Sequence, residues 1–267
     1  MIKIDKNIDD VPESLIPAFP DMFPNRGIPR SSKTTHTRRK ELIDNGAYID
    51  EANYNCRYKY KDIKEKLEKI YHGKCAFCEQ KVEQLHVEHF RPKKIYYWLA
   101  YSWDNLILAC PRCNTHKGIN FDLNGSKCSF ENNEENVRKI NKLSENYNLL
   151  EQPKMINPEN VDPSGHISFT KNGKINSLNH NIQYTITTCQ LNRNYLNDER
   201  RKILDMFKNE IQSELVSSEN AREQRHAIDV LVRQFIKASK EQSNEYIAFR
   251  KYSIANNWLN EVIQELI

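Results

Sequence analysis

Apolar residues recur at a helical spacing over residues 60–71. Ile63, Leu67 and Ile70 fall on one face of such a helix, and charged residues fill the positions between them. This period predicts an amphipathic helix, and Gly73 predicts where it stops.

The same spacing returns from about residue 182 and continues through the rest of the sequence. It predicts a helical region with three apolar stripes, which either form an internal core or serve as docking faces. The stripes are Leu196, Ile203, Leu204, Phe207, Ile211 and Leu215; Ile228, Leu231, Val232, Phe235 and Ile236; and Phe249, Trp258, Leu259, Val262, Ile263 and Leu266.

Other stretches lack a helical period. Residues 1–25 carry four prolines, the last of them Pro24, and predict an extended arm that lies on the body. Residues 119–150 are polar and predict a loop with some helix. Residues 155–176 look extended, and Asn172-Gly173 predicts a hairpin turn.

Composition narrows the class of protein. Lys and Arg number 40 against 36 Asp and Glu, a balance that excludes a histone-like polycation. Aromatic residues make up 10% of the chain, which excludes a disordered one, and its seven glycines disfavour Gly-rich nucleotide cradles. The sequence shows neither an apolar run of membrane-spanning length nor the layout of a signal peptide, so we expect a cytoplasmic protein with no membrane contact.

The strongest local charge bias lies in residues 26–40, which hold six Lys or Arg and no acid. Two interpretations stay open for this segment. It is either a solvated basic loop or a contact to a phosphate backbone.

Two Cys-x-x-Cys pairs carry the clearest metal signal. Cys75 and Cys78 form the first pair, Cys110 and Cys113 the second, and 31 residues separate them. Two such turns complete a tetrahedral site of four thiolates, so we expect a closed, structural Zn2+ site. A redox role is disfavoured because no strand–helix context supports it. The three remaining cysteines are expected to be small buried residues: Cys56, Cys128 and Cys189.

A second set of chemical groups lies between and just after these pairs. A phosphodiester hydrolase needs a base to activate water and a hard divalent cation to offset the phosphate charge. The neighbouring Glu88 and His89 supply a carboxylate and an imidazole, and Asn114 supplies an amide oxygen suited to a Mg2+-like ion. On a strand, adjacent side chains point to opposite faces, whereas at a strand end both can line one cleft. The sequence leaves that geometry open.

The segment from Lys74 to Gly118 resembles an HNH (ββα-metal) endonuclease. The residues that carry the resemblance are CAFCE, HVEHFRPK, WDNL, LACPRCN and HKG, in that order. Beyond this core, GKCAFCE, EHFRPKK, YYWLAYSWDNLILAC and TITTCQLN…LNDERRK resemble the PtuB-like nucleases of Septu and retron anti-phage systems. This wider likeness covers most of residues 57–202.

The resemblance implies an α+β fold, with a zinc-knuckle HNH ββα-metal core embedded in a mostly helical chain. We expect four parts: an N-terminal arm and basic segment (1–56), the nuclease core (57–125), a loop and β-hairpin extension (126–180) and a C-terminal helical region (181–267).

The resemblance also assigns roles to catalytic residues. His89 matches the general base, and Glu88 matches the acid that holds the catalytic metal. Asn105 matches the central Asn that braces the loop behind the base, and Asn114 matches the third position, a metal ligand. The motif is thus H-N-N, which favours Mg2+ or Mn2+. His116 is an alternative ligand.

Substrate contacts are expected from side chains around this motif. Residues 81–118 hold six Lys or Arg and three acids, an excess that suits a polyanion. The candidates are His86, Arg91, Lys93, Lys94 and Lys117. A structural role for His86, and a solvated surface role for Lys93 and Lys94, are equally open, and Lys117 either faces phosphate or caps its helix. Glu79 is expected to contact the zinc shell or to pair with a nearby lysine.

Three functions fit these residues. The first is a metal-dependent endonuclease acting on DNA or RNA, and the second is a toxin-like RNase cutting tRNA on the same scaffold. The third is a non-catalytic zinc-ribbon module that binds nucleic acid, which leaves Glu88, His89 and Asn114 without a role. The resemblance further implies an ABC/SMC-like ATPase partner and, in retron versions, a reverse transcriptase with its multicopy DNA–RNA.

Overall fold

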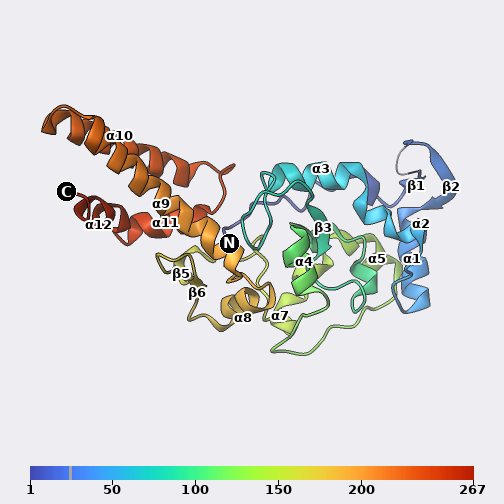
Figure 1. Cartoon of the computed structure of the whole chain (residues 1–267). Coiled ribbons are helices and arrows are strands. Elements are labelled where there is room, and N and C mark those ends of the chain that lie inside the picture. Colours follow the sequence, from blue (N-terminus) through green and yellow to red (C-terminus); the bar gives the residue numbers. More distant parts are fainter. Residues whose placement is uncertain (24–25) are drawn as a thin grey trace.

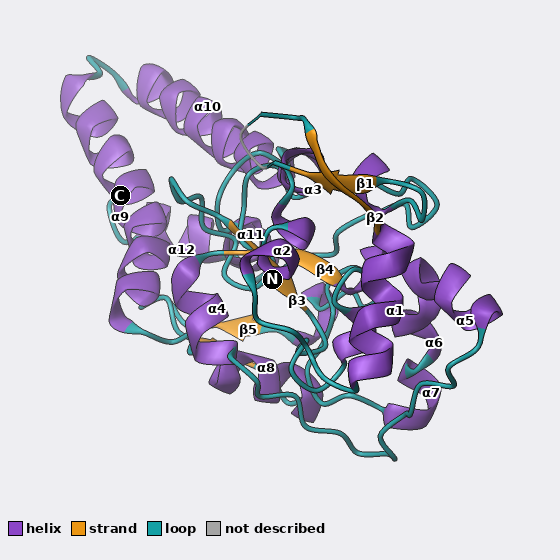
Figure 2. Cartoon of the chain, turned by 90° about the vertical axis from the view of Figure 1, so that its right-hand side faces the viewer, coloured by secondary structure: helices purple, strands orange, loops and turns teal. Residues whose placement is uncertain are grey.

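The structure is a computed structural model that describes residues 1–23 and 26–267. Pro24, one of the prolines of the predicted arm, lies outside the described residues. Strands pair two by two into three small antiparallel sheets, β1–β2, β3–β4 and β5–β6. Figure 2 shows these strands dispersed among helices rather than gathered into one sheet. The expected mixture of helices and small sheets is therefore present.

The N-terminal segment lies along the body. Met1, Ile2, Ile4 and Leu15 are buried, and the amide of Ile4 donates to the carbonyl of Pro158 over 2.9 Å. Strand β1 (Pro20–Met22) then pairs with β2 (Pro29–Thr34).

The basic segment is not the open loop that its charge suggested. It forms β2 and the first turns of helix α1 (Thr35–Asn45), whose N-cap residue Thr34 accepts from the amide of Thr37. Arg38 and Arg39 are buried, and Arg38 is paired with the buried carboxylate of Asp21. These two arginines therefore belong to the interior rather than to a solvated face.

The predicted amphipathic helix is α3 (Lys61–Ile70), which follows the short helix α2 (Ala52–Asn55) and the 3-10 turn Arg57–Lys59. Ile63 and Leu67 are fully buried on its inner face. Gly73 follows with a φ of 68°, and its amide donates to the carbonyl of Glu68, so the helix ends where the sequence predicted.

The central unit runs strand, strand, helix. Strand β3 (His86–His89) pairs antiparallel with β4 (Leu106–Ala109), which is buried along its whole length. Helix α4 (Pro111–Lys117) follows directly. The sulfur of Cys110 caps it by accepting from the amide of Cys113, and Pro111 occupies its first turn.

The middle of the chain is irregular, as predicted. Three short helices interrupt residues 119–151: α5 (Glu134–Arg138), α6 (Leu143–Asn146) and α7 (Asn148–Glu151). Strands β5 (Ser168–Phe169) and β6 (Ile175–Asn176) form the expected hairpin. At its turn Gly173 has a φ of 84°, and a Cβ there would lie 2.0 Å from the carbonyl oxygen of Asn197. A glycine is required at this position.

The C-terminal region is helical throughout. It comprises α8 (His180–Thr188), α9 (Asn194–Ser217), α10 (Ala221–Lys240), α11 (Ile247–Ala255) and α12 (Trp258–Gln264). Figure 1 shows α9 and α10 side by side, projecting away from the rest of the chain. The rings of Phe207 and Phe235 meet at 5.4 Å, so the apolar stripes largely cover one another. None of the helices in the described part of the chain has the length and apolarity to cross a membrane.

The isolated cysteines are buried to different degrees. Cys189 is buried, as predicted, whereas Cys56 and Cys128 are only half-buried. Their isolation in the sequence did not indicate this difference.

Candidate active site and metal centre

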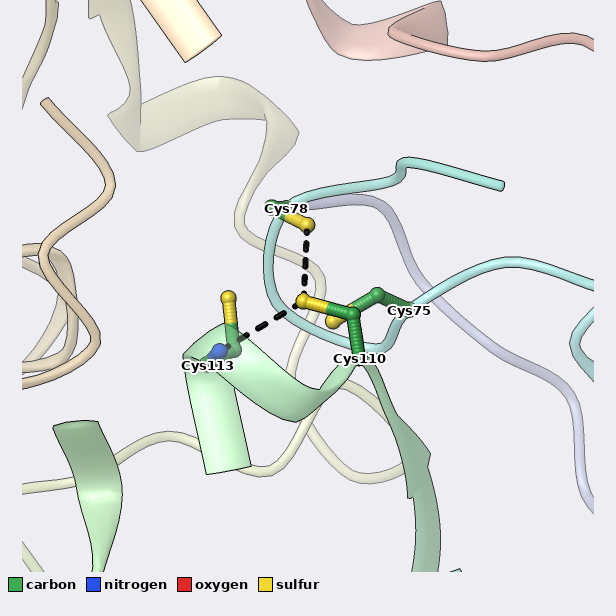
Figure 3. A group of neighbouring side chains, drawn as sticks. All are labelled: Cys75, Cys78, Cys110 and Cys113. Atoms are coloured by element: carbon green, nitrogen blue, oxygen red, sulfur yellow. Dashed lines mark hydrogen bonds between the residues drawn. The ribbon is translucent and has the colours of Figure 1, made fainter. Parts of the chain in front are cut away.

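The four cysteines of the two Cys-x-x-Cys pairs come together in one buried cluster. Their sulfurs all lie within 4.8 Å of one another. The sulfurs of Cys78 and Cys110 are 3.8 Å apart, and a tetrahedron with metal–sulfur distances of about 2.3 Å has edges of about that length. Figure 3 shows Cys110 and Cys113 at the start of α4, facing the turn that carries Cys75 and Cys78. The geometry therefore suits a four-thiolate zinc site.

Arg193, just before α9, lies against this cluster. Its guanidinium donates to the sulfur of Cys113 over 3.6 Å and to that of Cys110 over 3.9 Å. Burial opposes its charge, but attraction to Cys113 outweighs this and raises the pKa of Arg193. A zinc ion with four thiolates carries a net charge of about −2, and this arginine offsets part of it.

The turn around Cys75 and Cys78 also contacts helix α11 and the loop before it. Lys74 donates to the carbonyl of Asn244 over 2.9 Å, and the amide of Lys81 donates to the carboxylate of Glu245 over 2.6 Å. The carboxylate of Glu79 accepts from the amide of Ala248 over 3.1 Å.

Glu79 also accepts from the amino group of Met1 over 2.7 Å. Of the two roles expected for Glu79, it takes that of an ion-pair partner, although the cation is an amino group and not a lysine. Residues 74–81 are therefore the point where the N-terminal segment and the C-terminal helices meet.

A cleft of about 500 Å³ opens beside this cluster. The turn before α3, α3 itself, strand β3 and helix α4 build its walls. The residues that line it are Tyr58, Lys59, Lys64, Leu85, His86, Val87, Glu88, His89, Lys93 and Asn114. Five residues singled out from the sequence thus share one cavity: His86, Glu88, His89, Lys93 and Asn114.

Glu88 and His89 both line this cleft although they are neighbours on a strand. His89 is the last residue of β3, and the chain turns away directly after it. The alternation of side chains need not hold at a strand end. The geometry that the sequence left open is therefore the strand-end one.

The imidazole of His89 is held in one orientation. Its Nε2 lies 2.9 Å from the carbonyl oxygen of Ala100, an acceptor only, so Nε2 carries the proton and Nδ1 carries the lone pair. The ring of Tyr58 packs edge-on against it at 4.5 Å. Burial, and then the charge of Lys93, lower the pKa of His89 to about 3. The imidazole is thus neutral near pH 7.

Asn105 closes the loop that joins β3 to β4. Its Oδ1 accepts from the amide of Arg91 over 2.8 Å, and its Nδ2 donates to the carbonyls of Arg91 and Leu99 over 3.0 and 3.3 Å. The residue is completely buried. These bonds tie the chain after His89 to the residue just before Ala100, the partner of the imidazole.

Asn114 and His86 contact each other in the cleft lining. The amide Nδ2 of Asn114 lies 3.4 Å from Nδ1 of His86, which leaves the amide oxygen for another partner. Together with the carboxylate of Glu88, that oxygen forms a donor pair of the kind that hard divalent cations prefer.

Two of the residues predicted to contact phosphate, Arg91 and Lys117, form buried ion pairs in the structure. Arg91 donates to the carboxylate of Glu151 over 2.8 Å and is 1% exposed. Lys117 donates to Glu88 over 2.8 Å and is fully buried. Neither side chain lines the cleft, so these geometries do not favour the phosphate role. Lys94 is exposed but lies outside the cleft lining.

Lys93 does line the cleft, in an aromatic setting. Its ammonium donates to the hydroxyl of Tyr58 over 2.9 Å and lies 4.2 Å from the ring centre of Tyr48. Burial lowers the pKa of Lys93 to about 8.

Sequence reasoning missed the wall formed by Tyr58, Lys59 and Lys64. These residues precede the first Cys-x-x-Cys pair and carry no motif. Their signal is a cluster of basic and aromatic residues around the start of the predicted helix, which only the fold brings to the site.

Comparisons with known proteins agree with this geometry. The family model described as HNH endonuclease matches residues 75–119. Septu protein PtuB from Bacillus mycoides (strain KBAB4) is 33% identical over 165 residues, which is 55% of this chain and 52% of that protein. Septu protein PtuB from Bacillus thuringiensis is 32% identical over 99 residues, 36% of this chain and 34% of that protein.

The chain thus spans about half the length of the first of these relatives and about a third of the second. Both matches are to proteins with the same name, and the family model falls on the segment that builds the cysteine cluster and most of the cleft. Residues 75–119 thus match the HNH endonuclease family, within a chain that is similar to Septu protein PtuB.

Proposed function

We propose that this chain is a metal-dependent HNH endonuclease that hydrolyses phosphodiester bonds in nucleic acid, as the effector nuclease of an anti-phage defence complex of the Septu type. The observation that carries the proposal is the single cleft shared by His89, Glu88 and Asn114. The HNH domain match and the similarity to Septu protein PtuB support it.

His89 is the general base of this proposal. The carbonyl of Ala100 fixes the proton on Nε2, so Nδ1 is free to accept a proton from a water molecule in the cleft. Because burial keeps the imidazole neutral, the base is ready near neutral pH. Asn105 positions it by holding the loop that carries Ala100.

The donor set fits a hard divalent cation such as Mg2+ or Mn2+. Glu88 offers a carboxylate and Asn114 an amide oxygen, whereas the four sulfurs lie in a separate, closed cluster suited to Zn2+. When bound, a divalent cation supplies charge neutralisation at the scissile phosphate.

We assign substrate binding to the basic residues of the cleft lining. Lys59, Lys64 and Lys93 line the cleft from one side, and His86 lies at its exposed edge. Such groups contact a phosphate backbone without reading bases. We propose DNA as the first substrate to test, with RNA, tRNA included, as the alternative on the same scaffold.

The buried groups favour an enzyme over a binding module. His89 is 3% exposed and oriented by a single carbonyl, and Glu88 pairs with a buried lysine. Burying ionisable groups costs free energy, which a module that only binds phosphates on its surface has no need to spend.

An ABC/SMC-like ATPase is the proposed regulatory partner. The basis is the resemblance to Septu and retron nucleases and the similarity to Septu protein PtuB. A reverse transcriptase with its multicopy DNA–RNA is the corresponding partner in a retron setting.

The decisive experiment compares cleavage of supercoiled plasmid DNA and of total tRNA in Mg2+ or Mn2+. Wild type, His89→Ala and the control His226→Ala, which is exposed on α10 and lies outside the cleft lining, run with and without the ATPase. We expect metal-dependent cutting by wild type and by the control, and none by His89→Ala.

Cutting that appears only with the ATPase supports the defence-complex form of the proposal. If no substrate is cut under any condition while zinc is bound, the chain is a binding module and the proposal is wrong.

A further inference from the structure

The last turn of α4 places the ammonium group of Lys117 beneath the cleft. Nζ donates to Oε1 of Glu88 over 2.8 Å and to the carbonyl oxygen of His89 over 2.7 Å. The Lys117 side chain has no exposed surface, whereas that of Glu88 remains 13% exposed. One carboxylate oxygen therefore faces a buried positive charge while the same carboxylate lines the cleft.

Helix α4 carries two residues that bear on the role of the Glu88 carboxylate. Asn114 and Lys117 are three residues apart, so they lie on neighbouring positions of one helix face. Asn114 reaches the cleft and Lys117 lies behind Glu88. The same helix thus supplies one proposed cation ligand, Asn114, and fixes the positive charge of Lys117 next to the other, Glu88.

We propose that Lys117 positions Glu88 and at the same time weakens the binding of a divalent cation at the site. Its ammonium occupies Oε1, leaves Oε2 for the cation, and repels that cation. This inference rests on the proposed function, in which Glu88 is a cation ligand.

The size of the repulsion follows from the burial of Lys117. Near a protein surface charges interact through an effective dielectric constant of about 20, compared with about 80 in water. A buried ammonium cannot swing away into solvent, so a cation on the same carboxylate meets its charge at close range.

The cleft therefore binds its cation tightly only when the substrate is present. A phosphate in the cleft brings negative oxygens that offset Lys117 and complete the cation's ligands. Cation and nucleic acid therefore bind cooperatively, and the cation alone binds weakly.

The two roles of Lys117 predict opposite signs when its charge is removed. If the lysine only holds Glu88 in place, its loss frees the carboxylate and weakens cation binding. If its charge repels the cation, a neutral side chain that still donates hydrogen bonds strengthens cation binding.

The test is a titration of the zinc-loaded protein with Mn2+, followed by the electron paramagnetic resonance signal of free Mn2+. The variants are Lys117→Gln, which keeps a donor without a charge, and Lys117→Arg, which keeps the charge. We expect Lys117→Gln to bind Mn2+ about tenfold more tightly than wild type, and Lys117→Arg to bind it as wild type does.

A matched control separates contact from general charge. Lys61→Gln removes one exposed charge from α3, which forms a wall of the cleft, but Lys61 itself lies outside the cleft lining. We expect a change below about twofold. Zinc content and thermal unfolding show whether each variant is folded.

A measurement on wild type covers the case in which Lys117→Gln does not fold. A cleavage-resistant oligonucleotide is added to the Mn2+ titration, the Mn2+ that it binds alone is subtracted, and the apparent affinity of the protein for Mn2+ should rise at least about tenfold. An unchanged affinity overturns the inference.

Weaker or unchanged Mn2+ binding by folded Lys117→Gln also overturns it and leaves Lys117 with a structural role alone. Failure of the proposed function looks different: wild type and Glu88→Gln would then bind Mn2+ equally, because Glu88 would not be a ligand.

Discussion

The four-cysteine cluster and the cleft beside it are two candidate metal sites of opposite design. The cluster is closed and buried, its donors are four identical sulfurs, and Arg193 lies against it from another part of the chain. The cleft is open, and its donors are one carboxylate and one amide with a buried lysine behind them. The first arrangement suits an ion that holds the fold together, and the second suits an ion that comes and goes.

The largest effect is expected from breaking the cluster. Cys113→Ser removes one thiolate, and a structural zinc contributes about 10–16 kcal/mol to the folding of small domains. The contacts of Arg193 and residues 74–81 depend on the cluster, so α9 and α11 should lose protection in hydrogen exchange and the thermal unfolding midpoint should fall sharply.

Cys128→Ser is the matched control, since Cys128 is half-buried and outside the cluster. It should retain zinc and the wild-type exchange pattern. Unchanged zinc content and protection in Cys113→Ser would show that the cluster does not hold residues 74–81 against helices α9 and α11.

A smaller effect on stability is expected from Asn105, which closes the loop between β3 and β4. Asn105→Ala leaves the amide of Arg91 and two carbonyls buried without their partner, which costs about 2–4 kcal/mol in the free energy of unfolding measured with urea.

Asn114→Ala removes an amide of the same type from the open side of the cleft. Its stability should change by less than about 0.5 kcal/mol, while the proposed cleavage is lost. Equal losses of stability in both variants would contradict the division between a supporting and a ligand asparagine.

Lys93 tests the electrostatics of the cleft. Because burial lowers the pKa of Lys93 to about 8, its amine loses the proton as the pH rises through 8 and then becomes nucleophilic. Acylation followed by mass spectrometry should show labelling of Lys93 rising with a midpoint near pH 8.

Exposed Lys94, next in sequence, calibrates the reagent in the same peptide digest. If Lys93 and Lys94 show the same pH dependence, the burial of the Lys93 ammonium between Tyr48 and Tyr58 does not lower its pKa.

The smallest effect is expected from two lysines that line the cleft, Lys59 and Lys64. Lys59→Gln and Lys64→Gln should each weaken nucleic-acid binding a few-fold and reduce the slope of log affinity against log salt by about 1, with no loss of zinc or stability. Arg222→Gln, in the first turn of α10 at the end away from the body, should leave the slope unchanged. If Lys59→Gln or Lys64→Gln behaves like this control, that lysine does not contact the nucleic acid.

The sequence predicted the cluster better than the surroundings of the cleft. The Cys-x-x-Cys spacing dictates a turn geometry, so Cys75, Cys78, Cys110 and Cys113 needed no tertiary information. Residue type alone could not place Arg91 and Lys117, because long cationic side chains suit both a phosphate and a buried carboxylate. Their partners differ in origin: Glu151 lies 60 residues from Arg91, and Glu88 is itself part of the motif.

The same ambiguity affected the basic segment. Arg38 and Arg39 appeared to be surface charge, but Arg38 pairs with Asp21, and Arg39 donates to the carbonyls of Leu15 and Tyr101. In contrast, α3, the hairpin turn at Gly173 and the C-terminal helices followed from periodicity and turn chemistry, which are local properties of the chain.

The contacts between residues 74–81 and the segment from Asn244 to Ala248 bear on how the protein is made. The ribosome adds about 5–20 residues per second, so the 134 residues between Cys113 and Ala248 take about 7–27 s to appear. During that interval the growing chain already carries all four cysteines but lacks the helix that lies against their turn. Synthesis of the C-terminal helices is thus the step that completes the surroundings of the four-cysteine cluster.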